Sequence, residues 1–181
     1  MRRIMIVGGS GAGKSTAGLA LGRALNLPVH HVDRIYWGPQ WGKLSAEDRQ
    51  SALAQVLSLP GYVLEGGCPA TYDVRLADCD TLIWLDLNPA LRLLRILARV
   101  RRNRGRCRPD LPPDSPEDHP VHARRFWRHL ASELPREQAV FAALAAKAPT
   151  GTRVIRLTSR RAVKSFLQQY AAVAQVIAPE V

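Results

Sequence analysis

One glycine-rich segment near the N-terminus constrains the fold of this chain more than any other feature. Residues 8–15 read Gly-Gly-Ser-Gly-Ala-Gly-Lys-Ser and match the pattern G-x-x-x-x-G-K-[ST]. The segment directly follows the apolar run Ile4–Val7 and opens a helical pattern at Lys14–Leu25. A strand, a glycine-rich loop and a helix in this order predict a P-loop. In such a loop, inward-turned backbone N–H groups and the positive end of the helix dipole hold phosphate oxygens.

The side chains of this loop have distinct expected roles in binding magnesium-bound ATP. Lys14 is expected to reach the β- and γ-phosphates, and the Ser15 hydroxyl is expected to bind Mg²⁺. The nucleotide-binding residues predicted in the loop are Gly8, Gly9, Ser10, Gly11, Ala12, Gly13, Lys14 and Ser15.

Short apolar runs alternate with longer helical patterns along the chain. Most of the runs are continuously apolar and β-branched, which is typical of strands buried on both faces of a parallel sheet. This alternation predicts a three-layer α/β/α fold with right-handed crossovers, and the length of 181 residues fits one domain, 1–181. The expected strands are Ile4–Val7, Val29–Val32, Tyr62–Leu64, Thr81–Leu87 and Arg153–Leu157, and the expected helices are Lys14–Leu25, Ser45–Leu57, Asn88–Arg102, His122–Leu134 and a last one with an apolar stripe from Val163 to Ile177.

A proline-rich stretch, residues 103–120, interrupts this pattern. It contains five prolines, so it is not expected to form a regular element. A loop of this length inside a compact domain is usually functional or disordered. We expect it to be a mobile flap of the single domain.

The chain is strongly basic. Its 26 Lys and Arg against 15 Asp and Glu give a net charge of +11, and arginine dominates. Guanidinium groups suit bidentate phosphate recognition, so anionic ligands are expected, whether nucleotides, phosphorylated metabolites or nucleic acid. The three cysteines lack metal-ligand spacing and no run approaches a membrane span. We therefore expect free thiols and a cytoplasmic protein without a membrane partner, and the sequence does not indicate an oligomeric state.

Carboxylates follow two of the expected strands. Asp33 ends the second strand, and the carboxyl ends of parallel strands carry the ligand site, so Asp33 is expected to accept the proton of an acceptor hydroxyl or to help hold Mg²⁺. Glu65 ends the third strand before Gly66-Gly67 and is favoured over Asp86 as the carboxylate that orients water on Mg²⁺. The predicted metal residues are thus Ser15 and Glu65.

Arginines recur with helical spacing before the flap. Arg92, Arg95, Arg99 and Arg102 fall in one stripe, opposite Leu93, Ile96, Leu97 and Val100. Aligned like charges destabilise an isolated helix, and an anionic ligand would relieve the repulsion. Arg125 and Arg128 follow the flap, and arginines beside a closing flap can neutralise a transferring phosphoryl group.

Taken together, these segments resemble the nucleoside-monophosphate-kinase-like branch of P-loop kinases, most closely the topology modulation proteins, which are related to adenylate kinase. The resemblance spans nearly the whole chain. It rests on residues 8–15, Asp33 with the aromatic residues after it, Glu65-Gly66-Gly67, Arg75-Leu76-Ala77-Asp78, the arginine-rich helix and flap, and the closing strand with Ser159-Arg160-Arg161.

The resemblance implies a five-stranded parallel sheet in the order 2-3-1-4-5 with the flap as its LID. It assigns Lys14, Ser15 and Thr16 to ATP and Mg²⁺, Arg160 to the nucleotide base, Asp33 and Arg75 to the acceptor, and Arg99 and Arg102 to the edge of the LID. Lys14, Asp33, Arg99 and Arg102 are the expected catalytic residues, and Asp33, Glu65, Gly67, Arg75, Arg125 and Arg128 are the expected acceptor-binding residues. The chain departs from the family at Glu65-Gly66-Gly67-Cys68, and it lacks the AMP-binding patterns of adenylate kinases.

These features predict a small-molecule kinase that transfers the γ-phosphoryl group of ATP to a nucleotide, nucleoside or metabolite. A shikimate- or gluconate-type kinase differs from this prediction only in its acceptor. The alternative is a nucleotide-dependent nucleic-acid-binding or regulatory protein, for which the +11 charge argues but no recognised DNA- or RNA-binding motif does.

Overall fold

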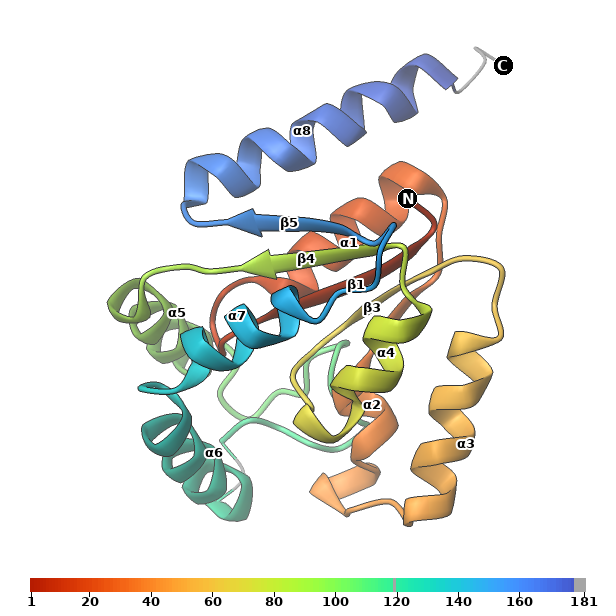
Figure 1. Ribbon diagram of the computed structural model, residues 1–181. Coiled ribbons are helices and arrows are strands. Elements are labelled where there is room, and N and C mark those ends of the chain that lie inside the picture. The colour runs from red at the N-terminus through yellow and green to blue at the C-terminus, as the bar shows by residue number, and fades with distance from the viewer. Residues whose placement is uncertain (119, 178–181) are drawn as a thin grey trace.

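A computed structural model describes residues 1–118 and 120–177. Five parallel strands form one sheet in the order β2-β3-β1-β4-β5, which confirms the predicted sheet and its strand order (Figure 1). The carboxyl ends of parallel strands lie at the same edge of a sheet, so the P-loop after β1 and the segments after β2 and β3 converge there. The strands are β1 (Arg3–Gly8), β2 (Val29–His31), β3 (Tyr62–Glu65), β4 (Thr81–Leu85) and β5 (Arg153–Leu157).

Helices cover both faces of the sheet and give the predicted three layers (Figure 1). The α-helices are α1 (Lys14–Leu25), α2 (Val32–Tyr36), α3 (Ala46–Leu57), α4 (Tyr72–Asp78), α5 (Pro89–Arg102), α6 (Pro120–Glu133), α7 (Glu137–Ala146) and α8 (Arg160–Ile177), and two short 3-10 helices are η1 (Pro39–Trp41) and η2 (Pro69–Thr71). In the part of the chain that the structure describes, no helix is both long and apolar enough to cross a membrane.

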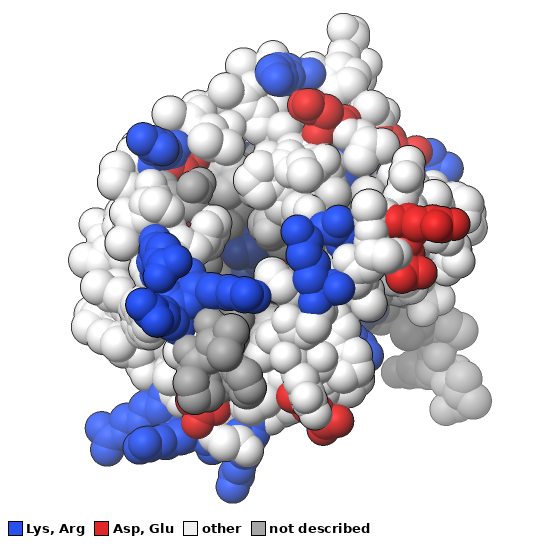
Figure 2. Space-filling view, turned by 90° about the horizontal axis from the view of Figure 1, so that it is seen from below, with Lys and Arg blue, Asp and Glu red and all other residues white. Residues whose placement is uncertain are grey.

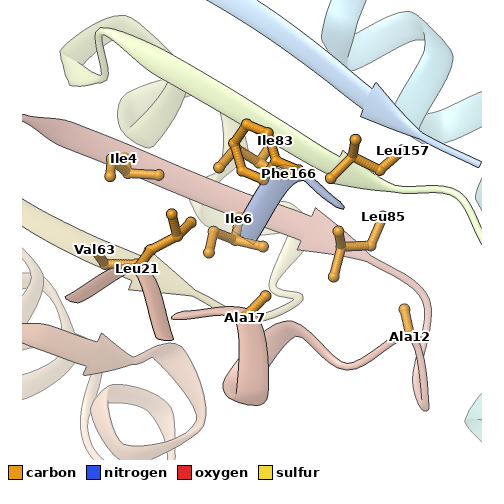
Figure 3. Packing of buried hydrophobic residues seen from close by; sticks show 10 residues of the cluster. All are labelled: Ile4, Ile6, Ala12, Ala17, Leu21, Val63, Ile83, Leu85, Leu157 and Phe166. Atoms are coloured by element: carbon orange, nitrogen blue, oxygen red, sulfur yellow. The ribbon is translucent and has the colours of Figure 1, made fainter. Parts of the chain in front are cut away.

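The central strand β1 is buried on both sides, as its continuous apolar sequence predicted. Ile4 and Ile6 pack on one face with Leu21 of α1 and Phe166 of α8 (Figure 3). Met5 and Val7 point to the other face and belong to a cluster with residues of α4 and α7. Burial of these side chains fixes the position of the P-loop, because the loop continues directly from β1.

Four of the five strands end one or two residues from the predicted position, and the strands that end early are β2 and β4. The second strand ends at His31, and Val32 already begins α2, so Asp33 lies in the first turn of a short helix. The fourth strand ends at Leu85 instead of Leu87. The sequence analysis also did not predict α4, a helix of seven residues.

The helix α5 turns its arginine face inward. Arg92 and Ile96 are buried on the side that faces the domain, so the prediction that Ile96 lies opposite the arginines was wrong. Leu94 and Leu97 are 65% and 49% exposed on the other side. The inward side of α5 meets the P-loop and buried carboxylates. Guanidinium groups can pair with these oxygen atoms, whereas leucine side chains in the same place would leave them without partners.

Candidate active site

The P-loop backbone requires glycine at several points. Gly8 has a φ of +147°, and a Cβ there would lie 2.6 Å from the carbonyl oxygen of Leu85. Gly11 has a φ of +78°, and a Cβ would lie 2.5 Å from the carbonyl oxygen of Arg92. Since β4 and α5 pack this closely against the loop, a side chain at either position would push the phosphate-binding backbone out of place.

Lys14 lies within the loop at the start of α1. Its Nζ donates to the carbonyl oxygen of Gly9 at 3.3 Å. Burial lowers the pKa of Lys14, and the nearby charges of Glu65 and Asp33 oppose that shift. The ammonium group therefore lies where the β- and γ-phosphates of a bound triphosphate would replace its backbone partner.

Two cavities meet at the P-loop. We call the first, of about 850 Å³, the donor cavity, and the second, of about 660 Å³, the acceptor cavity. Both volumes are within the usual range for small-molecule sites. Gly11, Lys14, Ser15, Arg99 and Arg108 line both cavities, so they mark the junction where a phosphoryl group would pass between two ligands.

The donor cavity is strongly cationic. Arg95 donates to the carbonyl oxygens of Gly11 and Ala12 at 3.4 and 3.5 Å, and burial lowers its pKa, with a further contribution from Arg160. None of the described residues that line this cavity is Asp or Glu. Its eight cationic side chains are Lys14, Arg95, Arg99, Arg102, Arg108, Arg160, Arg161 and Lys164. Thr16, Arg102 and Arg160, for which the sequence analysis expected nucleotide or LID contacts, all line this cavity.

The acceptor cavity contains the predicted carboxylates. Asp33, Glu65, Gly67 and Arg125 all line it. Asp33 is an exposed residue at this cavity, but the surrounding protein atoms remove part of the hydration of its carboxyl group. This loss of hydration raises the pKa of the Asp33 carboxyl, and the charge of Glu65 raises it further. A carboxylate with a raised pKa is suited to accept a proton from a hydroxyl group.

Glu65 is held by His31, a neighbour that the sequence analysis did not assign to the site. His31 Nδ1 and Glu65 Oε1 are 2.5 Å apart, and both side chains are largely buried. The competing carboxylate, Asp86, accepts from Arg156 Nε at 2.9 Å and lines neither cavity. The strand-end positions of His31 and Glu65 were visible in the sequence, but their pairing depends on β2 lying beside β3.

Flap residues close the junction from the side of α5. Glu117 is buried and lies 2.6 Å from Arg99 Nη2 and 3.5 Å from Arg108 Nε, and Arg108 also lies 3.4 Å from Asp110. Burial lowers the pKa of Arg99, and the charge of Arg108 adds to this effect. The sequence analysis did not identify Asp110 or Glu117 as site residues. In the sequence, only their position after the arginines of the flap could have indicated that they belong to the site.

The flap is also docked against the acceptor side. The backbone N–H of Trp41 donates to Ser115 Oγ at 3.1 Å, and its indole Nε1 donates to the carbonyl oxygen of Pro116 at 2.9 Å. Ser115 is completely buried. One tryptophan therefore joins η1 to a segment more than seventy residues later, and the two form a common wall of the acceptor cavity.

Two predicted site residues lie elsewhere. The guanidinium group of Arg75 donates to the carbonyl oxygens of Gly66 and Leu64 at 3.0 and 3.1 Å, is 1% exposed and lines neither cavity. Arg75 thus braces the end of β3 and does not face an acceptor. Arg128 is exposed on α6 and also lies outside both cavities.

The oxygen donors at the junction fit a magnesium ion that arrives with its nucleotide. Ser15, Asp33 and Glu65 all line the acceptor cavity. Mg²⁺ prefers oxygen ligands and usually binds through one or two carboxylates together with substrate phosphates. Within residues 1–118 and 120–177, no group of three or more His, Cys, Asp or Glu side chains is placed to hold a metal ion.

The outer surface of the site is basic. Figure 2 shows the end of the molecule where α2, α3 and α6 lie, and the surface there is hollowed. Lys and Arg side chains stand on both sides of the hollow, and more basic atoms are visible at its floor (Figure 2). This arrangement attracts anionic ligands from solution.

The fold, the P-loop and the two adjoining cavities define the class of this protein: it is a P-loop small-molecule kinase. No known family model matches the chain. A shikimate kinase of Corynebacterium efficiens is 34% identical over 146 residues, which cover 72% of this chain and 82% of that protein. The chain belongs to the shikimate kinase family.

Solved structures show the same fold at low sequence identity. Shikimate kinase from Acinetobacter baumannii, solved in complex with shikimate, has a TM-score of 0.54 and 18% identity, with 99% of this chain and 96% of that chain covered. Shikimate kinase from Bacteroides thetaiotaomicron has a TM-score of 0.51 and 20% identity, with 96% and 98% covered. Both support the P-loop kinase architecture described above.

Proposed function

We propose that this protein transfers the γ-phosphoryl group of ATP to a hydroxyl group of a small metabolite. The observation that carries the proposal is the junction of the two cavities, where Lys14 of the P-loop faces the carboxylate of Asp33. A cationic cavity on one side of this junction suits a triphosphate, and the other side offers a base to a hydroxyl group.

The reaction follows from the positions of these side chains. Asp33 accepts the proton of the acceptor hydroxyl, and the oxygen of that hydroxyl forms a bond to the γ-phosphorus. The bond from this phosphorus to the β–γ bridging oxygen breaks, and ADP leaves. Lys14, Arg99 and Arg108 lie around the transferred group and stabilise its negative charge. Bound Mg²⁺, held by Ser15 and the acidic side chains, would neutralise further phosphate charge.

The flap would cover the site of transfer and exclude water from it. Residues 103–118 carry Arg108 and Glu117 into the junction and pack on Trp41, so they cover both the transferred group and the acceptor. Exclusion of water from the junction favours transfer to the acceptor over hydrolysis. We propose that the flap opens to admit ligands and closes over them before transfer.

Two other functions agree less well with the site. Phosphorylation of a nucleoside monophosphate is less favoured, because the relative named above is a shikimate kinase and the AMP-binding patterns are missing. A nucleic-acid-binding role, suggested by the resemblance to topology modulation proteins, relies on net charge. Eight of the 26 Lys and Arg residues instead line the donor cavity.

An acceptor screen tests the proposal. ADP release is measured with Mg²⁺ and ATP over a panel that includes shikimate, gluconate, nucleoside monophosphates and uncharged alcohols. With an active acceptor, Lys14→Ala and Asp33→Asn should each lower kcat by at least about a hundredfold. ATP binding should persist in Asp33→Asn, and Lys147→Ala, an exposed lysine paired with Asp73, serves as the control. ATP binding without phosphoryl transfer to any acceptor would refute the proposal.

A further inference from the structure

A buried carboxylate of the flap lies between two arginines at the junction of the cavities. Glu117 Oε1 lies 2.6 Å from Nη2 of Arg99, and Glu117 Oε2 lies 3.5 Å from Nε of Arg108. The side chain of Glu117 is 8% exposed and lines the acceptor cavity, whereas the two arginines line both cavities. A carboxylate with so little contact with water is stable only when cations pair with it.

The members of this cluster come from separate parts of the chain. Arg99 belongs to α5, whose inward face is buried against the domain. Arg108 lies in the first half of the flap and Glu117 near its end, so the carboxylate links both halves of the flap to α5. Asp110 also holds Arg108 from within the flap, whereas Glu117 is the ion-pair partner of Arg99 among the described residues.

The cations at the junction repel one another. Burial lowers the pKa of Arg99 and the charge of Arg108 lowers it further, whereas the charge of Glu117 opposes this shift. Burial also lowers the pKa of Lys14, and the charge of Arg99 contributes to that shift. These side chains are therefore close enough to interact through their charges. The carboxylate of Glu117 offsets part of the repulsion and so lets two guanidinium groups lie side by side.

Glu117 leaves much of the hydrogen-bonding capacity of both arginines unused. A guanidinium group has five N–H donors. Nε of Arg99 and Nε of Arg108 are buried and make no hydrogen bond to any described residue. Buried donors without partners are costly, and an arrangement that served stability alone would pair them. Phosphate oxygens at the junction would give these guanidinium groups the additional acceptors that they lack.

We propose that Glu117 is a positioning residue that holds Arg99 and Arg108 in the orientation in which they stabilise the transferred phosphoryl group. This inference rests on the proposed function, which assigns that group to the junction. The carboxylate takes one N–H side of the arginine pair and leaves the remaining donors to phosphate oxygens. Because the arginines then need no rearrangement during transfer, the benefit falls on the transition state more than on bound ATP.

Two nucleotide probes test this difference by calorimetry on the full chain. MgADP with aluminium fluoride imitates the transferred phosphoryl group, and the magnesium complex of adenylyl imidodiphosphate imitates bound ATP. Glu117→Gln keeps the shape of the side chain and removes its charge. We expect it to weaken binding of the first probe by at least about tenfold and of the second by less than about twofold. Glu117→Asp keeps the charge and should lose less affinity for the first probe than Glu117→Gln.

Asp118→Asn is the matched control. Asp118 also links the two ends of the flap, because its Oδ2 accepts from the backbone N–H of Gly105 at 2.9 Å, but it lines neither cavity. A purely structural role of the flap acids would give both variants similar losses with both probes.

Three results would overturn the inference and leave the proposed function standing: no loss in Glu117→Gln, an equal loss for both probes, or the same losses in Asp118→Asn. If aluminium fluoride did not tighten binding of MgADP to the wild-type protein, the inference would fail together with the proposed function.

Discussion

The docking of the flap can be tested by removing a single hydroxyl group. Ser115 Oγ accepts from the backbone N–H of Trp41 at 3.1 Å and donates to the carbonyl oxygen of Pro113 at 3.0 Å, and the residue is fully buried. Ser115→Ala removes both hydrogen bonds, and it takes away an acceptor from a buried backbone donor. Such a loss costs about 1–3 kcal/mol. The bond from Trp41 holds the flap on η1, and the bond to Pro113 lies within the flap, so we expect the cost to fall on flap docking more than on global unfolding.

At about 2 kcal/mol, the population of open flap would rise about thirtyfold. Limited trypsin digestion measures this directly, since Arg104 and Arg106 lie in exposed parts of the flap. Cleavage there should accelerate in proportion, and Mg²⁺ with ATP should slow it in the wild type. Ser132→Ala, which removes an exposed hydroxyl of α6, is the control. If Ser115→Ala and Ser132→Ala were cleaved in the flap at the same rate, the proposed docking would be refuted.

Two further predictions concern stability. Asp33 has a pKa raised above its unfolded value, so its ionised form destabilises the folded protein. Asp33→Asn should therefore raise the thermal midpoint at neutral pH. The gain should decline as the pH falls below the raised pKa and should vanish below the unfolded value of 3.8. A midpoint difference that did not change with pH would contradict this reasoning. A Cβ at Gly9 would overlap the buried ion pair of Arg92 and Glu137, so Gly9→Ala should cost about 3 kcal/mol in urea unfolding. Gly151→Ala, where only a positive φ opposes a side chain, should cost about 1 kcal/mol. A loss at Gly151 equal to or larger than that at Gly9 would argue against the overlap at Gly9.

The sequence predicted the framework of the site well. The spacing within residues 8–15 and the apolar run before them were sufficient for the P-loop, because its glycines and its lysine act through local backbone geometry. Asp33 and Glu65 were identified for a similar reason. Each follows an apolar run, and the carboxyl ends of parallel strands meet at one edge. A short helix such as α4 gave too little periodic pattern to be predicted.

The tertiary structure determined which charged side chains face the interior and with which groups they pair. A stripe of arginines on α5 looks the same in sequence whether it faces solvent or the interior, and only the carboxylates and carbonyl oxygens brought against it turned it inward. The sequence analysis assigned Arg75 to the acceptor, but its guanidinium group donates hydrogen bonds to the carbonyl oxygens of Gly66 and Leu64. Glu117 became part of the site because the flap folds back on Arg99. Pairings between distant segments depend on chain closure, and local pattern carries no information about them.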